Sequence, residues 1–322
     1  MADPRLTQQL PFTLGATHLD ALGPRYEGKV RDVYARKDTL VLIASDRLSA
    51  FDRVLTTLPF KGEVLNRLAH FWFEHTKDLV ANHLLDVPDP NVTVARACEP
   101  IKVEVVVRGY LTGSLWRDYE KGLHTTYGLA LPGGMKKDTR FDAPLLTPST
   151  KAPKGEHDAP ISEADVVTRG LASPRDWQRV REAALALFAA GEAWASSRGL
   201  ILVDTKYEFG KIGDALYVID EMHTPDSSRF WEADTYAERF QAGGDQRMLD
   251  KENVRQWLIR ERGWQGVGDL PVIPEDVRVR TAEIYVNAFV RLTGEQLPLE
   301  VGDVGARLTR ALTTRGYLPQ AG

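Results

Sequence analysis

Residues 200–231 read LILVDTKYEFGKIGDALYVIDEMHTPDSSRFW, and this stretch predicts a β-hairpin that carries a charged site. Residues 200–209 have the β-branched and aromatic content of a strand. Residues 210–214 (GKIGD) form a predicted five-residue hairpin loop, and residues 215–220 form the second strand. Both strands are otherwise too apolar for a fully exposed ribbon, so we expect their ionisable side chains to be partly enclosed.

Three charged side chains of this hairpin share one face. Side chains alternate along a strand, which places Asp204, Lys206 and Glu208 together. If the loop closes symmetrically about Ile212, Asp220 lies directly across from Asp204 and diagonal to Lys206. Facing carboxylates destabilise a strand pair, so a cation is expected among them. Lys206 supplies one charge, and Mg²⁺ with nucleotide phosphates is the other candidate. A solvated acidic surface would explain the carboxylates alone equally well.

Length and charge limit the class of protein. The 322 residues suffice for a large core and for two lobes or domains. A net charge of −4 gives no electrostatic reason to expect nucleic acid. Cys98 is the only cysteine, which excludes an intramolecular disulfide and a thiolate metal cluster. The start of the sequence has no basic region followed by an apolar run, and no apolar stretch approaches membrane-spanning length. A soluble, cytoplasmic protein is therefore expected.

Strands and helices alternate along the chain without internal repeats. Periodicity and turn residues predict strands at 25–34, 39–44 and 96–107, helices at 62–80, 174–198 and 275–292, and a long irregular segment at 133–160. Loops of that length in compact domains are usually functional or disordered. Ser173 is the predicted N-cap of the helix that follows it.

A glycine turn near the start of the chain imitates a phosphate-binding loop. Residues 23–29 (GPRYEGK) fit the first seven positions of the P-loop pattern, but Val30 stands where Ser or Thr would bind Mg²⁺. The following residues alternate like a strand instead of a helix, which excludes a P-loop. The alternative is a glycine turn that opens into a strand, with Lys29 and Arg31 on one face and able to meet phosphate oxygens. Taken alone, a turn with two surface cations explains these residues better.

Two further clusters follow apolar strands. Residues 45–52 (SDRLSAFD) are dense in hydroxyls and charges at a strand end. In residues 105–116 (VVVRGYLTGSLW), Arg108 ends a strand and Ser114 could cap the next helix. Together they would make a pocket for a phosphate monoester. For each cluster, an ordinary cap or turn is an equally good explanation.

Five ordered motifs resemble those of the SAICAR synthetase (phosphoribosylaminoimidazole-succinocarboxamide synthase) family. The resemblance extends over residues 12–265 and rests on the segments YEGKVRDVY (26–34), SDRLSAFD (45–52), VRGYLTGS (107–114), LVDTKYEFG (202–210) and DEMHTPDSSR (220–229). The segment 250–258 (DKENVRQWL) is also similar to the family's D-K-Q-x-x-R-D-W-L stretch, but it departs from that pattern at Glu252, Asn253 and Gln256.

The resemblance implies an α+β, two-lobed ATP-grasp-like fold that is related to the protein kinases, with antiparallel sheets and a helical C-terminal part. It predicts a β-rich lobe at 1–103, a central lobe at 104–245 and C-terminal helices at 246–322. The implied reaction joins the carboxylate of carboxyaminoimidazole ribotide (CAIR) to the amine of L-aspartate. ATP is consumed through an acyl phosphate, with SAICAR, ADP and phosphate as products. The implied partners are these small molecules and Mg²⁺, without nucleic acid or membrane, in a monomer or small homo-oligomer.

Site residues carry over motif by motif. The resemblance implies Mg²⁺ ligands at Glu208 and Asp220; catalytic residues Lys206, Asp204 and Lys151; ATP contacts at Gly28, Lys29, Arg31, Arg96, Lys102 and Glu104; and ribotide contacts at Arg108, Ser114, Asp226, Ser227 and Arg229. His157 and Asp158 also match the family, and Ser45, Asp46 and Arg47 are candidates for binding L-aspartate. Two other classes remain open. A kinase-like phosphotransferase lacks support because no H-R-D-x-x-x-x-N or D-F-G element is found, and a nucleotide-binding sensor would not need this full set of residues.

Overall fold

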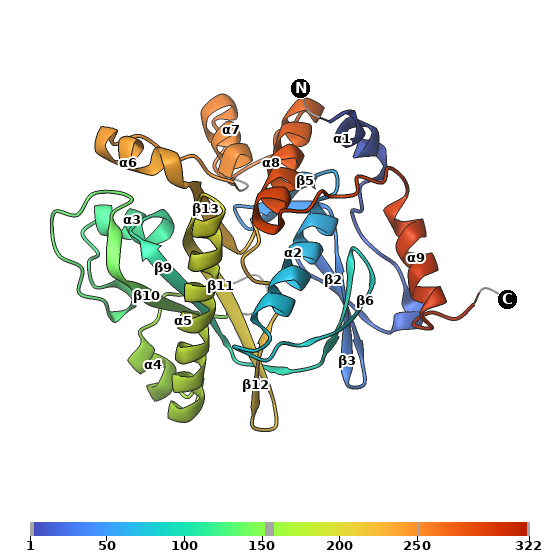
Figure 1. Ribbon diagram of the computed structural model, residues 1–322, viewed down its shortest axis with the longest axis horizontal. Coiled ribbons are helices and arrows are strands. Elements are labelled where there is room, and N and C mark those ends of the chain that lie inside the picture. The colour runs from blue at the N-terminus through green and yellow to red at the C-terminus, as the bar shows by residue number, and fades with distance from the viewer. Residues whose placement is uncertain (1–2, 152–157, 250–251, 321–322) are drawn as a thin grey trace. The chain divides into compact units, whose positions relative to one another are not determined.

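The computed structural model describes residues 3–151, 158–249 and 252–320 and combines helices with antiparallel sheets (Figure 1). The strands are β1 (Arg25–Glu27), β2 (Arg31–Arg36), β3 (Thr39–Ala44), β4 (Arg47–Ala50), β5 (Arg53–Thr57), β6 (Leu84–Asp89), β7 (Val92–Arg96), β8 (Glu99–Pro100), β9 (Val103–Tyr110), β10 (Arg140–Thr150), β11 (Leu200–Ile212), β12 (Ala215–Ile219) and β13 (Ser228–Glu232). The α-helices are α1 (Pro4–Gln9), α2 (Lys61–Thr76), α3 (Gly113–Glu120), α4 (Glu163–Thr168), α5 (Pro174–Ser197), α6 (Ala233–Ala242), α7 (Glu252–Arg262), α8 (Glu275–Thr293) and α9 (Val304–Thr314). The predicted α+β class with a helical C-terminal part is confirmed.

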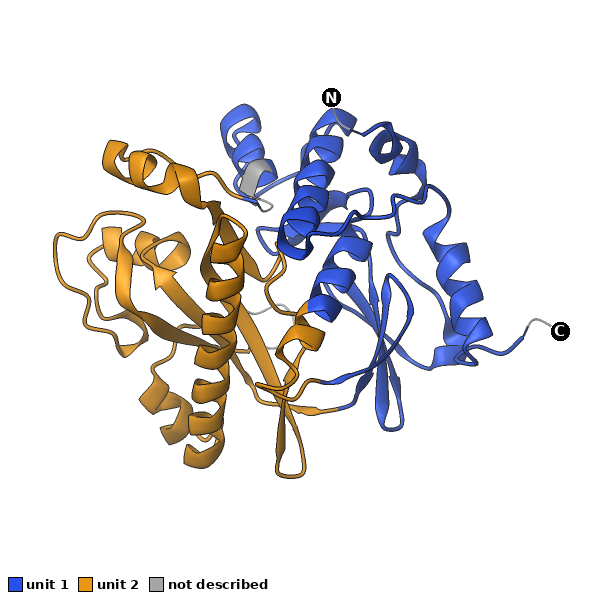
Figure 2. Cartoon of the chain, in the orientation of Figure 1, with its two compact units in different colours: residues 1–71, 83–97, 249–322 blue, residues 72–82, 98–248 orange. Residues whose placement is uncertain are grey.

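The chain forms two compact units, each built from separate segments (Figure 2). Unit 1 comprises residues 1–71, 83–97 and 249–322, and unit 2 comprises residues 72–82 and 98–248. The predicted division into a β-rich lobe at 1–103, a central lobe at 104–245 and C-terminal helices at 246–322 stays a prediction.

Unit 1 is built on an antiparallel sheet in the order β1-β2-β3-β7-β6. Its core joins β-branched side chains of the sheet to the apolar face of α9, so the last helix belongs to the same core as the first strands. The core contains Leu14, Leu22, Tyr34, Val41, Ile43, Val92, Val94, Val304, Leu308, Leu312 and Leu318. The predicted single strand at 25–34 is two strands, because a turn at Gly28 interrupts it between β1 and β2.

Unit 2 is built on a sheet in the order β10-β9-β11-β12, with β13 and β8 also paired to β11. One face of this sheet carries apolar side chains such as Val105, Val107 and Tyr207, which are fully buried. Helix α5 packs against β11 and β9 through its own buried stripe, and Phe188 of that stripe lies against Gly109. The other face of the sheet therefore remains for polar side chains. Ser173 caps α5 as predicted, since its Oγ accepts a hydrogen bond from the Asp176 N–H at 3.1 Å.

The predicted hairpin exists, but its register was wrong. β11 continues to Ile212 and pairs with Ala215, so a two-residue turn, residues 213–214, replaces the predicted five-residue loop. Glu208 pairs with Ile219 in this register. Asp204 consequently lies beyond the hairpin and pairs with Arg108 of β9 and with β13 instead of facing Asp220.

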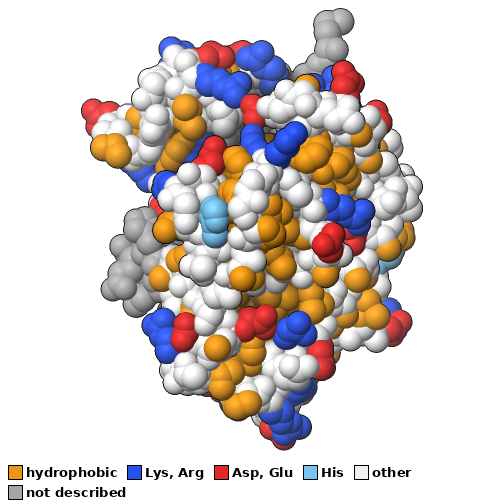
Figure 3. All heavy atoms as spheres, turned by 90° about the vertical axis from the view of Figure 1, so that its left-hand side faces the viewer, with side chains coloured by type: hydrophobic (Ala, Val, Ile, Leu, Met, Phe, Trp, Pro, Cys, Tyr) orange, Lys and Arg blue, Asp and Glu red, His pale blue; other side chains and the backbone are white. Residues whose placement is uncertain are grey.

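Some helix and strand bounds also differ from the sequence analysis. The strand predicted at 96–107 is β9, which runs from Val103 to Tyr110 after the short β8. No helix in the described ranges is long and apolar enough to cross a membrane. The side of the molecule that faces the viewer in Figure 3 shows hydrophobic side chains interspersed with charged side chains of both signs. This mixture accords with a net charge of only −4.

Candidate functional site

The polar face of the unit 2 sheet gathers charged side chains from several strands. Antiparallel pairing of β9 with β11 sets Arg108 opposite Asp204 and Val106 opposite Lys206. On the other side of β9, β10 places Thr147 opposite Val106. On the other side of β11, β13 places Arg229 opposite Asp204. Residues far apart in the sequence thus form two adjoining clusters on one surface.

In the first cluster, two arginine side chains donate hydrogen bonds to one carboxylate. Asp204 Oδ2 accepts a hydrogen bond from Arg108 Nη1 at 3.1 Å and another from Arg229 Nη1. Two further Arg108 donors bind hydroxyls: Nε donates to Thr147 Oγ1 at 2.9 Å and Nη2 donates to Ser114 Oγ at 3.1 Å. The Arg108 side chain is only 5% exposed, whereas that of Arg229 is 29% exposed. Two guanidinium groups and one carboxylate leave an excess positive charge, which favours binding of an anion.

The N-terminus of helix α3 lies beside this pair of arginines. Gly113 begins the helix with φ +61°, and a Cβ atom at that position would come within 2.7 Å of the Arg229 guanidinium carbon. The close approach therefore requires glycine. Thr112, not Ser114, occupies the N-cap position, so the predicted capping role of Ser114 was wrong. Ser114 Oγ instead accepts a hydrogen bond from Arg108 Nη2.

The second cluster surrounds Lys206 with carboxylates. Lys206 Nζ donates to Glu208 Oε1 at 2.7 Å and to Glu104 Oε1 at 3.1 Å. The other oxygen of Glu208 accepts a hydrogen bond from Lys151. Asp220, which follows β12 with φ +69°, contributes to the negative field at Lys206. Glu104, which is predicted to contact ATP, therefore accepts a hydrogen bond from Lys206, a predicted catalytic residue.

Burial and charge act in opposite directions on these groups. Burial lowers the pKa of Lys206, but the carboxylates of Glu208, Glu104 and Asp220 outweigh it and raise that pKa, so the ammonium stays charged. Burial raises the pKa of Glu208, but Lys206 and Lys151 outweigh it and hold that pKa well below its usual range. Burial dominates at Glu104, whose pKa is raised. The cluster thus keeps an ionised carboxylate and a lysine cation in a poorly solvated place.

These carboxylates suit a hard cation that shares its ligands with a nucleotide. Glu208 is mostly buried and ionised, and Asp220 and Glu104 add oxygen donors near Lys206. Mg²⁺ in such sites takes one or two protein carboxylates and completes its shell with phosphates and water. Within the described ranges no group of three or more His, Cys, Asp or Glu side chains forms a metal site by itself. The donor set therefore fits Mg²⁺ together with phosphates better than a metal held by protein alone.

The predicted nucleotide residues at the start of the chain belong to unit 1. Gly28 forms the turn between β1 and β2, with its N–H bonded to the Arg31 carbonyl at 2.8 Å. Lys29 is exposed and pairs with Asp52 at 2.6 Å. Arg96 ends β7, and its guanidinium donates to the Leu84 carbonyl at 3.0 Å. Lys102 belongs to unit 2, where its carbonyl accepts a hydrogen bond from the Lys151 N–H at 3.3 Å.

Ser45, Asp46 and Arg47 are buried in unit 1 and are engaged within it. Asp46 accepts hydrogen bonds from the backbone N–H groups of Leu14 at 2.7 Å and Gly62 at 2.9 Å. Burial raises the pKa of Asp46 to about 6, and these two hydrogen bonds oppose the shift. The side chains of Ser45 and Arg47 bind backbone carbonyls of the same unit. A role in binding L-aspartate is untested and stays a prediction.

The segment 220–229 ends at the arginine pair. Ser227 is buried, and its Oγ accepts a hydrogen bond from the Thr224 N–H at 3.1 Å. The Asp226 N–H donates to Thr224 Oγ1 at 3.3 Å. Side-chain hydroxyls thus fix the backbone that leads into β13 and Arg229. The contacts of Asp226, Ser227 and Arg229 with the ribotide stay a prediction.

Sequence reasoning overlooked two buried side chains. Thr147 orients Arg108, and Asp32 pairs with Arg47 at 2.9 Å. Asp32 lies in the strand predicted at 25–34, where the alternation of side chains was the available signal. Thr147 lies in β10, within the segment predicted to be irregular at 133–160, so that prediction was wrong for residues 140–150. His157 lies outside the described residues.

Comparison with known proteins identifies the family. The family model of SAICAR synthetase matches residues 24–270. The chain belongs to the SAICAR synthetase family.

Relatives and solved structures of the family agree with this assignment. The phosphoribosylaminoimidazole-succinocarboxamide synthase of Cytophaga hutchinsonii is 49% identical over 84% of this chain and 87% of its own length. That of Legionella pneumophila (strain Lens) is 43% identical over 89% and 92%. The SAICAR synthase of Saccharomyces cerevisiae, complexed with SAICAR, superimposes with a TM-score of 0.78 at 34% identity over 89% of this chain and all of its own. A SAICAR synthetase in complex with ADP gives 0.65 at 25% identity over 85% and 99%. The ATP-grasp-like fold predicted from the motifs is confirmed by these structures.

Proposed function

We propose that this chain joins the carboxylate of CAIR to the amine of L-aspartate, consuming ATP and releasing SAICAR, ADP and phosphate. One observation carries the proposal in addition to family membership. The arginine pair on Asp204 and the lysine–carboxylate cluster at Lys206 occupy one face of one sheet. A ligand with a phosphate at one end and a reacting carboxylate at the other suits such adjoining clusters.

The arginine pair is the proposed site of the ribotide phosphate. Planar guanidinium groups bind a phosphate dianion through paired hydrogen bonds and keep their charge at any physiological pH. Asp204 brings one negative charge to the two positive charges of Arg108 and Arg229. Ser114, in the first turn of α3, adds a hydroxyl. In this assignment Asp204 orients the arginines and does not touch the reacting atoms.

The lysine–carboxylate cluster is the proposed site of phosphoryl transfer. A carboxylate is a poor electrophile, so one of its oxygens first attacks the γ-phosphorus of ATP, and ADP leaves. The amine of L-aspartate then attacks the acyl carbon, loses a proton, and phosphate leaves. Lys206 and Lys151 carry positive charge toward the transferred group, which such a reaction needs more than a covalent nucleophile. Glu208 and Asp220 would hold Mg²⁺, which when bound to the ATP phosphates neutralises their charge.

The remaining proposed contacts are with ATP and L-aspartate. The glycine turn at Gly28, with Lys29 and Arg31, would meet the ATP phosphates, and the segment 96–104, with Arg96, Lys102 and Glu104, would lie beside adenine. The structure of a relative in complex with ADP supports a nucleotide as substrate. L-aspartate as the amine donor, a cytoplasmic location and a monomeric or small homo-oligomeric state are parts of the same proposal.

A coupled assay of ADP release tests the proposed reaction. With ATP, MgCl₂, CAIR and L-aspartate all present, ADP release should be rapid and should match SAICAR formed one to one. Omission of L-aspartate or CAIR should abolish sustained turnover. Sustained ADP release without L-aspartate, together with a phosphorylated product, would instead indicate a kinase-like phosphotransferase. Nucleotide binding without turnover in any mixture would indicate a sensor protein.

A further inference from the structure

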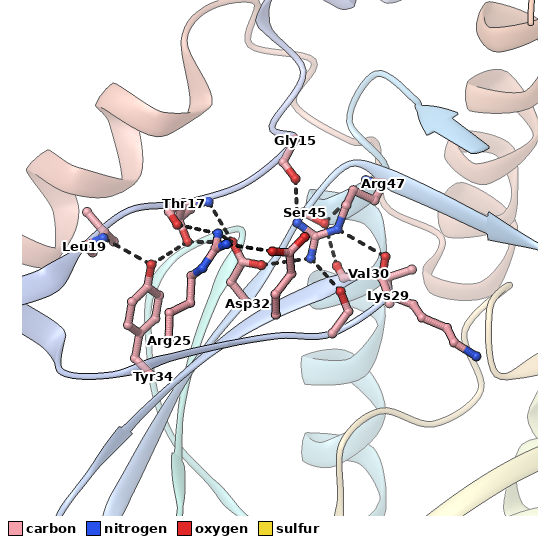
Figure 4. A network of polar contacts seen from close by, with 12 residues as sticks. Gly15, Thr17, Leu19, Arg25, Lys29, Val30, Asp32, Tyr34, Ser45 and Arg47 are labelled. Carbon is pink, nitrogen blue, oxygen red and sulfur yellow. Dashed lines mark hydrogen bonds and ion pairs between the residues drawn. The ribbon is translucent and has the colours of Figure 1, made fainter. Parts of the chain in front are cut away.

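Arg47 lies at the centre of a buried network in unit 1 (Figure 4). Its Nε donates to the Lys29 carbonyl at 3.2 Å, and its Nη2 donates to the Gly28 carbonyl at 3.1 Å. Nη2 also pairs with Asp32 at 2.9 Å, and Nη1 donates to the Gly15 carbonyl. A guanidinium has five N–H groups, and four hydrogen bonds are already formed here. The fork that a substrate carboxylate would need is therefore occupied.

Asp32 fixes the position of Arg47 from the other side. The second oxygen of Asp32 accepts hydrogen bonds from the Thr17 N–H at 2.7 Å and the Thr17 hydroxyl at 2.8 Å. Arg25 Nη1 lies 3.4 Å from the same oxygen. Burial raises the pKa of Asp32, but the hydrogen bonds from Thr17 and Arg47 outweigh it and lower that pKa. Arg47 thus faces a carboxylate whose ionised form is favoured and whose position is fixed by hydrogen bonds.

The network turns the carbonyl groups of the glycine turn inward. Arg47 binds the carbonyls of Gly28 and Lys29, and the Val30 carbonyl accepts hydrogen bonds from the Ser45 N–H at 3.0 Å and the Ser45 hydroxyl at 2.8 Å. In a planar trans peptide the carbonyl and the following N–H point in opposite directions. The N–H groups of Lys29 and Val30 therefore point away from Arg47.

This orientation creates a place for an anion at the turn. Successive N–H groups that point outward from a turn form a concave anion-binding site. The Lys29 ammonium lies at the same turn, where it pairs with Asp52; both side chains are exposed, and because exposed ion pairs are weak, a phosphate can replace Asp52 as its partner. A Cβ atom on Gly28 would lie 3.0 Å from the Arg31 carbonyl oxygen, so glycine keeps the turn tight.

We propose that Arg47 is a positioning residue for nucleotide phosphates. It holds the Gly28 and Lys29 carbonyls inward, so that the N–H groups of the turn and the Lys29 ammonium are presented to the phosphates. The proposal rests on the proposed function, which places ATP phosphates at this turn, and it gives Arg47 a role other than contact with L-aspartate.

Calorimetric binding of ADP with MgCl₂ to Arg47→Lys, Lys29→Ala and the double variant tests the proposal. Lysine keeps the charge but has three donors on a single nitrogen, whereas Arg47 meets four acceptors with a planar fork, so Arg47→Lys should weaken ADP binding about tenfold. Arg47 orients the N–H groups of the turn as well as the Lys29 ammonium, so the double variant should bind ADP more weakly than Lys29→Ala, but by less than the two single losses combined. The KM for CAIR should stay within about twofold of wild type.

Arg25→Lys is the matched control. Arg25 also contacts Asp32 and the Thr17 carbonyl, at 3.4 and 2.7 Å, but binds no carbonyl of residues 28–30 in the described structure. Its replacement should leave ADP affinity unchanged. Circular dichroism and thermal unfolding check each variant. If Arg47→Lys does not fold, Ser45→Ala releases the hydroxyl bond to Val30 and should weaken ADP binding about two- to tenfold.

The outcomes separate this proposal from the proposed function. Weakened binding by Lys29→Ala with unchanged binding by a folded Arg47→Lys, or by Ser45→Ala in its place, overturns the positioning role alone. Additive losses in the double variant, or a rise confined to the KM for L-aspartate, also overturn it. Unchanged ADP affinity in all of these variants overturns both this role and the placement of ATP phosphates at the turn.

Discussion

Replacing Arg108 tests the proposed ribotide site most sharply, because its guanidinium makes three contacts in the first cluster. It binds Asp204 and the hydroxyls of Thr147 and Ser114, and its side chain is 5% exposed. Arg108→Ala removes one of two cations from a pair that shares one carboxylate. The excess positive charge disappears, while Asp204 keeps Arg229 as its partner.

The magnitude follows from the loss of a buried charged hydrogen-bonding group. Such a loss costs about 2–5 kcal/mol, which lowers kcat/KM for CAIR roughly 30- to 5,000-fold. Arg108→Lys keeps the charge but loses the fork, so about 1.5–3 kcal/mol, or roughly 10- to 150-fold, should be lost. Both variants should retain wild-type affinity for an unreactive ATP analogue. Steady-state kinetics with CAIR as the varied substrate, together with calorimetry of the analogue, measure these effects.

A matched control and two contrary results make the test decisive. Arg140, on the neighbouring strand β10, is 64% exposed and pairs with Glu192. Arg140→Ala should leave kcat/KM for CAIR within about twofold of wild type, since exposed ion pairs contribute little. If Arg108→Ala changed kcat/KM for CAIR by less than about threefold, Arg108 would not hold the ribotide phosphate. A large loss of affinity for the ATP analogue with an unchanged KM for CAIR would mean that Arg108 contacts ATP and not the ribotide.

Three other substitutions test the metal site, the helix terminus and the buried imidazole. Glu208→Gln should lower turnover at saturating MgCl₂ by about two orders of magnitude or more, since a metal ligand is lost; near wild-type turnover would refute the metal site. Gly113→Ala should raise the KM for CAIR about tenfold or more, because φ +61° costs about 1–2 kcal/mol for alanine and the new methyl group would displace Arg229. An unchanged KM would show that the close contact between Gly113 and Arg229 does not matter for binding CAIR. Burial lowers the pKa of His223 to about 3 in the folded protein, whereas the same imidazole in the unfolded chain has a pKa of about 6.5. As the pH falls below about 6.5, the unfolded chain takes up a proton that the folded protein does not, so the folded state loses stability. Denaturant unfolding should therefore show wild type losing about 2–3 kcal/mol relative to His223→Phe between pH 6 and pH 4, and a constant difference would mean that His223 is not held neutral.

Local patterns predicted strands at β9, β11 and β12 but missed β10 and β13, and they did not show which strands pair. The strand residues Lys206 and Glu208 share a face and contact each other, as alternation requires. The predicted register failed because the loop was taken as five residues, whereas Gly213, at φ +57°, permits a two-residue turn. The alternation of apolar and polar residues in β12 did not by itself distinguish a five-residue loop from a two-residue turn.

Long-range pairing explains what the sequence could not show. Arg108 lies opposite Asp204 only because β9 pairs with β11, and no local feature of either strand specifies that neighbour. Likewise, the polar residues of SDRLSAFD were interpreted as candidate ligands because they follow a strand. In the structure Asp46 and Arg47 bind backbone groups at Gly62 and Gly15, which only the fold brings to them. Family motifs grouped Arg108, Asp204 and Arg229 without knowledge of these pairings, and the structure brings the three side chains together.

Transfer of an oxygen label tests the acyl phosphate, on which the proposed function depends. CAIR labelled with ¹⁸O in both carboxylate oxygens is converted by the enzyme with ATP, MgCl₂ and L-aspartate, and the released phosphate is analysed by mass spectrometry. If a carboxylate oxygen attacks the γ-phosphorus and later leaves with the phosphoryl group, each phosphate released should contain one ¹⁸O atom and the amide should retain the other. Unlabelled phosphate formed in step with SAICAR would contradict activation of the carboxylate by phosphorylation.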